Sequence, residues 1–73
     1  MKPIRVGIVG CGVIAPTHAA CYRRHADVQI TWACDLKLDK ARALAKAFEI
    51  PRVTDDVRQM LDAPDTDLVS ICT

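Results

Sequence analysis

The glycines are the most constraining feature of this chain, because all three lie between positions 7 and 12. They fall within and directly after the run from Ile4 to Val9, which is rich in β-branched residues. Such a run is typical of a strand that is buried on both faces of a parallel sheet. A helical pattern begins soon after Gly12. The sequence therefore predicts a strand, a tight glycine turn and a helix.

The glycine turn has a spacing that is associated with a particular ligand. Residues 10–15 read GCGVIA, which is the pattern G-x-G-x-x-A. Between a strand and a helix, this pattern is the dinucleotide-binding fingerprint. Gly10 allows the tight turn, Gly12 lets the backbone approach a pyrophosphate, and Ala15 permits close packing of helix and strand. The free N–H groups at the start of the helix then face the anion.

A turn without a ligand is the alternative interpretation of the same residues. It would need one glycine and would not require a small residue at Ala15, so it explains the pattern less well. Gly7 fits a structural role, because a glycine in the middle of a strand lets a helix or the cofactor lie close to the sheet.

The rest of the chain alternates between the strand period and the helix period. We expect strands at residues 4–9, 28–34, 52–54 and 68–72, and helices at residues 13–26 and 38–49, with a short third helix that ends at residue 61. This alternation predicts an α/β fold, a Rossmann-type parallel sheet of strand order 3-2-1-4 with helices on both faces, which is the first half of a doubly wound fold.

The helix ends carry more detailed expectations. If Gly12 caps the first helix, Pro16 is its fourth residue, where the missing N–H has no intrahelical partner to lose. Thr54 or Asp55 is expected to cap the third helix. The side chains expected to face inward from that helix are Val57, Met60 and Leu61.

Asp35 is a second, independent sign of nucleotide binding. It ends the second strand, whose tip lies beside that of the first strand in this topology. A carboxylate there can accept both hydroxyls of an adenosine ribose and would repel a 2′-phosphate. This favours NAD over NADP, although Lys37 nearby weakens the preference. The alternative is that Asp35 only caps the helix that follows.

Composition excludes several other classes of protein. Ten basic and nine acidic residues give a net charge of +1, which provides no basic surface for nucleic acid or an anionic membrane. No apolar run approaches a membrane span, and the run before Cys11 is too short for a lipoprotein signal. The four cysteines, which are expected to be reduced, favour a cytoplasmic protein.

The cysteines and histidines do not indicate a metal site. The four cysteines lack CxxC spacing and are expected to be reduced thiols that act as small apolar residues. His18, Cys21 and His25 would share one face of the first helix, but no fourth ligand follows them. We expect no metal to bind there.

Several motifs together resemble one family. The stretch IRVGIVGCGVIAPTHAA, the strand that ends in Asp35, the helix DKARALAKAF and the segment DTDLVSICT resemble the start of the glucose–fructose oxidoreductase and inositol dehydrogenase (Gfo/Idh/MocA) family. The resemblance implies a two-domain oxidoreductase that acts on sugars, inositols or related polyols. It places the pyrophosphate on the backbone of Gly12, Val13 and Ile14, the adenosine ribose on Asp35 beside Leu36, and the nicotinamide ribose near Cys72 and Thr73.

The resemblance also sets expectations for what the chain does. Residues 1–73 would be the N-terminal dinucleotide-binding half-domain of an NAD(P)-dependent dehydrogenase, without the substrate domain and without the family's catalytic lysine. The 73-residue chain alone is then expected to be inactive. Because residues 68–72 would form an exposed apolar edge strand in that chain, we also expect it to self-associate through them as a homo-oligomer. The alternatives are a regulatory module that senses NAD and a methyltransferase that binds S-adenosylmethionine.

Overall fold

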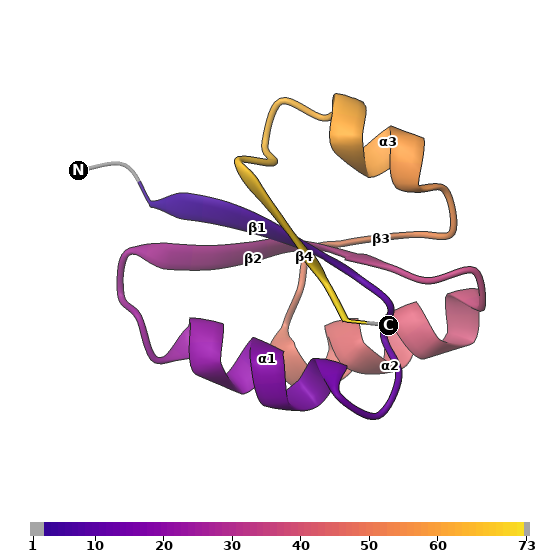
Figure 1. Ribbon diagram of the computed structural model, residues 1–73, viewed down its shortest axis with the longest axis horizontal. Coiled ribbons are helices and arrows are strands. Elements are labelled where there is room, and N and C mark those ends of the chain that lie inside the picture. Colours follow the sequence, from indigo (N-terminus) through magenta and orange to yellow (C-terminus); the bar gives the residue numbers. More distant parts are fainter. Residues whose placement is uncertain (1–2, 73) are drawn as a thin grey trace.

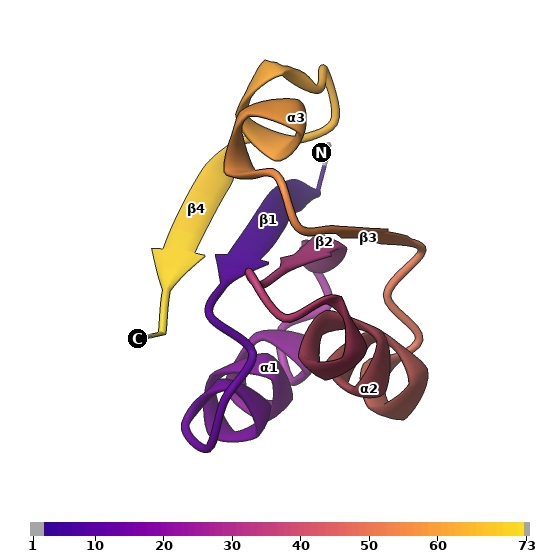
Figure 2. The ribbon, with the colours of Figure 1, turned by 90° about the vertical axis from the view of Figure 1, so that its right-hand side faces the viewer.

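The computed structural model describes residues 3–72, which form a four-stranded parallel sheet covered by helices. The strands lie in the order β3-β2-β1-β4, with α1 and α2 on one face and α3 on the other (Figures 1 and 2). The predicted fold class is confirmed. The elements along the chain are β1 (Ile4–Val9), α1 (Ala15–Arg23), β2 (Val28–Cys34), α2 (Leu38–Phe48), β3 (Arg52–Thr54), α3 (Val57–Asp62) and β4 (Leu68–Ile71).

Helix α1 is shorter than predicted at both ends. Ile14, not Gly12, is its N-cap, so Pro16 is the second helical residue rather than the fourth. Proline is favoured in the first turn, where its fixed φ suits the helix and its missing N–H costs nothing. At the other end, the N–H of His25 donates to the carbonyl of Tyr22 in a tight turn. His25 therefore lies beyond the helix.

The main core lies between the sheet and the pair α1 and α2. Val6 and Ile8 of β1 are fully buried there. Ala15 and Ala19 of α1 are fully buried against them, because small side chains let the helix approach the sheet closely. The buried stripe of α2 consists of Ala41, Leu44 and Ala45.

A bulge in β2 distributes its side chains between the two faces. The register with β1 shifts so that it skips Thr31. Ile30 packs against the core of α1 and α2, whereas Trp32 packs against Met60 of α3. Two residues apart on a regular strand would face the same side. The bulge therefore turns the indole of Trp32 toward α3.

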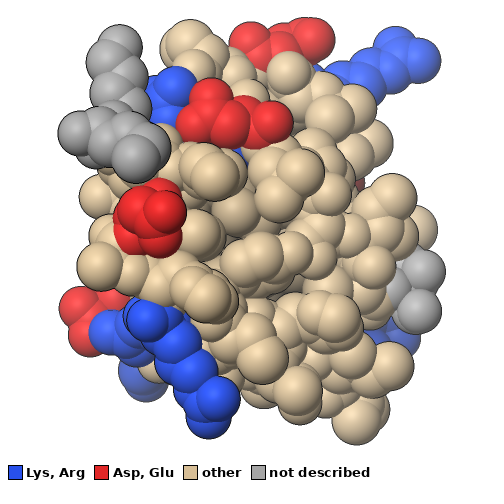
Figure 3. Space-filling view, turned by 60° about the vertical axis from the view of Figure 1, so that its left-hand side comes forward, with Lys and Arg blue, Asp and Glu red and all other residues tan. Residues whose placement is uncertain are grey.

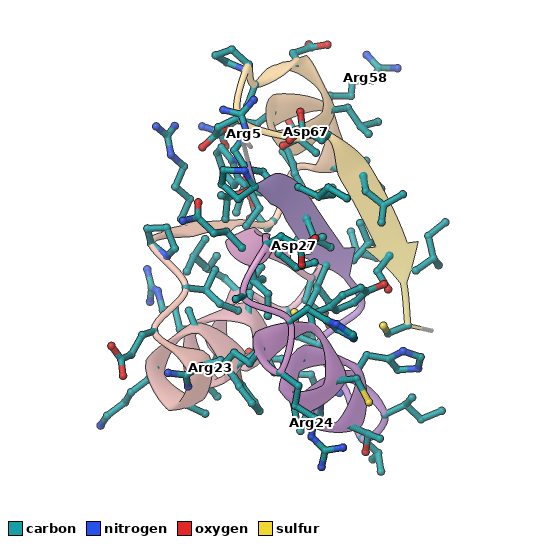
Figure 4. All side chains as sticks on the ribbon, turned by 90° about the vertical axis from the view of Figure 1, so that its left-hand side faces the viewer. Arg5, Arg23, Arg24, Asp27, Arg58 and Asp67 are labelled. Carbon is teal, nitrogen blue, oxygen red and sulfur yellow. The ribbon has the colours of Figure 1, made fainter. Side chains whose placement is uncertain are left out.

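Two aspartates fix the chain between α3 and β4. Asp65 accepts from the Trp32 Nε1–H at 2.9 Å and pairs with the Arg52 Nε at 3.1 Å. Asp67 accepts from the backbone N–H of Arg5 at 2.9 Å and from its guanidinium Nε at 3.1 Å (Figure 4). The bonds of Asp67 align the start of β4 with β1, and those of Asp65 hold the same segment against β2 and β3.

Helix α3 differs from the prediction in its cap and in its buried face. Asp56, rather than Thr54 or Asp55, is the N-cap, and its carboxylate accepts from the Arg58 N–H at 3.0 Å. Met60 is fully buried, but Val57 and Leu61 are 39% and 54% exposed. Met60 is thus the buried residue of this six-residue helix.

Strand β4 is an edge strand of the described sheet, and two of its apolar side chains are exposed. Leu68 and Ile71 are 48% and 72% exposed, and the strand ends at Ile71, one residue earlier than expected. In Figure 3 the charged side chains lie toward the rim of the molecule, and a wide area between them carries no charge.

Met60 of α3 packs closely over Gly7 of β1. A Cβ built on Gly7 would lie 3.1 Å from Met60 Cγ and closer still to its Sδ. Of the two roles predicted for this glycine, the approach of a helix is therefore the one the structure shows.

We predict that Gly7→Ala lowers the free energy of unfolding by about 1–3 kcal/mol, because the methyl group overpacks the contact with Met60. Gly12→Ala is the matched control, since a Cβ at Gly12 meets nothing within 4 Å. Its effect should stay within about 0.5 kcal/mol. Chemical denaturation of both variants measures this, and equal stabilities would contradict the account of Gly7.

Candidate functional site

The carboxyl ends of the four strands meet at one edge of the sheet, toward which Figure 2 looks. The turn of residues 10–14 lies there, between β1 and α1. Gly10 has a φ of 87°, which L side chains rarely adopt. Its N–H donates to the carbonyl of Cys34 at 2.8 Å and holds the turn against the end of β2. The backbone itself therefore requires glycine at this position.

Gly12 is a different case from Gly10. A Cβ at Gly12 would meet nothing within 4 Å, so the packing of the described chain does not require glycine there. The next two side chains, Val13 and Ile14, are 97% and 53% exposed. The turn thus presents open backbone to solvent at the place where the fingerprint brings a pyrophosphate against the chain.

Asp35 lies beside this turn, as its position after β2 predicts. Its Oδ2 accepts from the N–H of Cys11 at 2.7 Å, and its Oδ1 accepts from the N–H of Lys37 at 2.8 Å. These bonds, first Lys37 and then Cys11, lower the pKa of the Asp35 carboxyl, and the charges of Lys40 and Lys37 act in the same direction. The group is a carboxylate at neutral pH.

A cleft of about 500 Å³ opens next to the Asp35 carboxylate. Leu36 forms one wall with a side chain that is 92% exposed. Asp55 and Asp56, at the entry to α3, form part of another wall. The sequence interpretation did not assign them to the site, although they follow β3 and so had to lie at the same edge. The three aspartates give the cleft a negative charge.

A second hollow of about 400 Å³ lies on the other side of the turn, between α1 and α2. Gly12, Val13 and Lys40 line it. A third cleft, of about 510 Å³, lies at the opposite edge of the sheet and includes Arg23 (Figure 4). None of the predicted site residues lines that third cleft, so it is not part of this site.

Of the remaining predicted residues, Cys72 directly follows β4. Cys72 is 7% exposed, and its N–H donates to the carbonyl of Val9 at 2.8 Å. Its thiol packs in the main core, so the backbone is the part that can approach a ligand. Thr73 lies outside the described residues.

The thiol of Cys11 also faces the protein, not the cleft. Its Sγ donates to the carbonyl of Cys34 at 3.4 Å, and burial raises its pKa to about 11. Burial also raises the pKa of Cys34. The two thiols are therefore neutral core groups, unsuited to act as nucleophiles.

The face predicted for His18, Cys21 and His25 does not form, because α1 ends before His25. Among residues 3–72, no three histidine, cysteine or acidic side chains gather where they could hold a metal ion. None of the helices in this range is long and apolar enough to cross a membrane.

The sequence and the fold match one family of oxidoreductases. The family model for the Gfo/Idh/MocA oxidoreductases, with their NAD-binding Rossmann fold, matches residues 4–73. The chain belongs to the Gfo/Idh/MocA oxidoreductase family. This agrees with the resemblance found in the sequence motifs.

Individual relatives support the same family. D-glucoside 3-dehydrogenase of Escherichia coli K12 is 39% identical over 73 residues, which cover 99% of this chain. The structure of GenD2 from gentamicin A biosynthesis, in complex with NAD, superimposes with a TM-score of 0.92 at 25% identity over 100% of this chain. Scyllo-inositol dehydrogenase of Lactobacillus casei gives 0.87 at 25% identity over 99%. The chain spans 21%, 21% and 22% of these three proteins.

We predict that the pKa of the Asp35 carboxyl lies below the usual value for aspartate, because it accepts from two backbone N–H groups. Because its pKa is lowered on folding, it stabilises the folded state above its unfolded-state pKa, and this contribution is lost as the pH falls through the folded-state pKa. A carbon-detected NMR titration of the aspartate carboxyls measures this. A midpoint at or above the usual value would contradict the two hydrogen bonds.

Proposed function

We propose that this chain is the nucleotide-binding part of an NAD-dependent dehydrogenase. The observation that carries the proposal is the turn at Gly12, which leaves open backbone beside the carboxylate of Asp35 although packing does not require glycine there. An open turn suits a pyrophosphate, and a carboxylate at the end of the neighbouring strand β2 suits a ribose. The pyrophosphate and the adenosine ribose of the expected ligand would therefore each meet a suitable group of the chain.

The chain's own residues would bind and orient the cofactor. The backbone of Gly12, Val13 and Ile14 would hold the pyrophosphate, supported by the positive end of α1. Asp35 would accept the adenosine hydroxyls, and Leu36 would lie beside the adenosine. Cys72 and Thr73, which follow β4 in the sequence, would lie beside the nicotinamide ribose, as the family resemblance implies.

The reaction we propose is hydride transfer between nicotinamide and a carbon that bears a hydroxyl in a sugar, inositol or related polyol. The nicotinamide supplies the hydride chemistry when it is bound. The names of the glucoside and inositol dehydrogenases among the relatives support this substrate class. The part proposed for residues 1–73 is cofactor binding as an N-terminal half-domain, with the substrate-binding and acid–base groups supplied from outside these residues.

The nucleotide we propose is NAD in preference to NADP. The cleft beside Asp35 also contains Asp55 and Asp56, so a 2′-phosphate would meet several negative charges. Lys37 and Lys40 lie near the Asp35 carboxylate and reduce this repulsion. The preference is therefore expected to be moderate.

We predict that Gly12→Val abolishes NAD binding and leaves the fold intact. The side chain has free space in the unliganded chain but would occupy the volume of the pyrophosphate. Isothermal titration calorimetry with NAD measures binding, and thermal unfolding measures stability. Gly12→Ala should give an intermediate loss. Near-normal affinity in Gly12→Val would show that the anion does not lie on this turn.

We also predict that Asp35→Ser lowers the ratio of NAD affinity to NADP affinity. The substitution removes the acceptor for the ribose hydroxyls and the charge that repels the 2′-phosphate. Titration of both nucleotides against the wild type and the variant gives the ratio. If the ratio does not change, Asp35 does not select the nucleotide.

A further inference from the structure

We propose that Asp35 is also a positioning residue, which holds the fingerprint turn in its binding conformation before any nucleotide arrives. This role is separate from contact with the ribose, and its significance for binding rests on the function proposed above. The structure on which it depends, however, can be tested without a ligand.

The carboxylate of Asp35 connects two turns at the edge of the sheet. Its Oδ2 accepts from Cys11, in the middle of the fingerprint turn, at 2.7 Å. Its Oδ1 accepts from Lys37, the N-cap residue of α2, at 2.8 Å. The N–H of Asp35 itself donates to the carbonyl of Thr54 on β3 at 3.2 Å. One residue thus links the ends of β1, β2 and β3.

The fingerprint turn has few other contacts to hold it. It contains two glycines, whose backbones lose the most conformational entropy on ordering. Val13 is 97% exposed, and Ile14 caps α1 without a side-chain hydrogen bond. The bond from Gly10 to Cys34 fixes the start of the turn, and the Cys11 thiol bond to the same carbonyl adds to it. The carboxylate of Asp35 fixes the N–H that follows Gly10, so less ordering remains for the ligand to impose.

The chemistry of a carboxylate suits both roles at once. Its two oxygens offer about four lone-pair positions. The backbone N–H groups of Cys11 and Lys37 use one position on each oxygen. The other positions remain for the two ribose hydroxyls. Asparagine would place an NH₂ group against one of the two N–H groups, and glutamate is longer by one methylene and does not fit the same two bonds.

Amide hydrogen exchange without nucleotide tests the positioning role. In Asp35→Asn, we expect the N–H groups of Cys11 and Lys37 to exchange about tenfold faster than in the wild type. Asp55→Asn is the matched control, because Asp55 lines the same cleft but, among residues 3–72, its carboxylate accepts no hydrogen bond from a backbone N–H. It should leave both rates unchanged. Unchanged rates in Asp35→Asn would overturn the proposal.

The wild-type protein provides a second test in case the variant does not fold. If the carboxylate accepts from both amides, the amide proton shifts of Cys11 and Lys37 should move together on acidification, with one midpoint equal to that of the Asp35 carboxyl. Two shifts that do not follow this titration would overturn the proposal even if every variant unfolds.

Asp35→Glu separates positioning from charge during binding. It keeps a negative charge at the tip of β2, so the ratio of NAD to NADP affinity should stay close to that of the wild type. Loss of the preformed turn should weaken both nucleotides by a similar factor, about tenfold. Wild-type affinity for both would contradict the positioning role. If the wild type binds neither nucleotide, the proposed function fails, whereas the exchange measurements still decide the role of Asp35 in the turn.

Discussion

The hydrogen bonding of β1 to both of its neighbours is the constraint on which the domain depends. β1 pairs with β2 on one side and with β4 on the other. The helical connections that lead into β2 and into β4 are therefore positioned against β1. Its side chains Val6 and Ile8 support α1 and α2, and the absence of a side chain at Gly7 admits Met60 of α3. Where β1 ends, Gly10 turns the chain toward α1. The strand that organises the core therefore also positions the open turn.

The glycines of this segment have three separable roles. Gly7 makes room for α3, Gly10 adopts a backbone conformation that other residues rarely adopt, and a Cβ at Gly12 would meet nothing within 4 Å. Two of them are explained by the fold alone. The third is explained when a ligand is placed against the backbone, and Asp35 lies beside it with a carboxylate that is already ordered by two N–H groups. The glycines that the fold requires and the glycine proposed to face the ligand thus lie within one short segment.

The strand order and the position of Asp35 beside the turn could be predicted from the sequence, because the signals for them are local and periodic. The β-branched runs, the stripe of α2 and the fingerprint gave the strand order and placed Asp35 beside the turn. The bulge at Thr31 could not be predicted, since it depends on how β2 pairs with β1. The cap of α3 was misplaced, because three adjacent residues can all accept from a helix N-terminus and only the backbone geometry selects Asp56. The amide partners of Asp35 and the aspartates of the cleft depend on how separate segments come together.

The most direct test of the account is an NMR titration of the wild-type protein with NAD, followed by backbone amide shifts. The account predicts that the largest changes occur at residues 10–14 and 35–36, on both sides of the cleft beside Asp35. Residues 23–31, around the separate cleft at the opposite edge of the sheet, should change little. Saturating NAD that leaves residues 10–14 unchanged, or that shifts the opposite edge most, would contradict the assignment of this turn as the cofactor site.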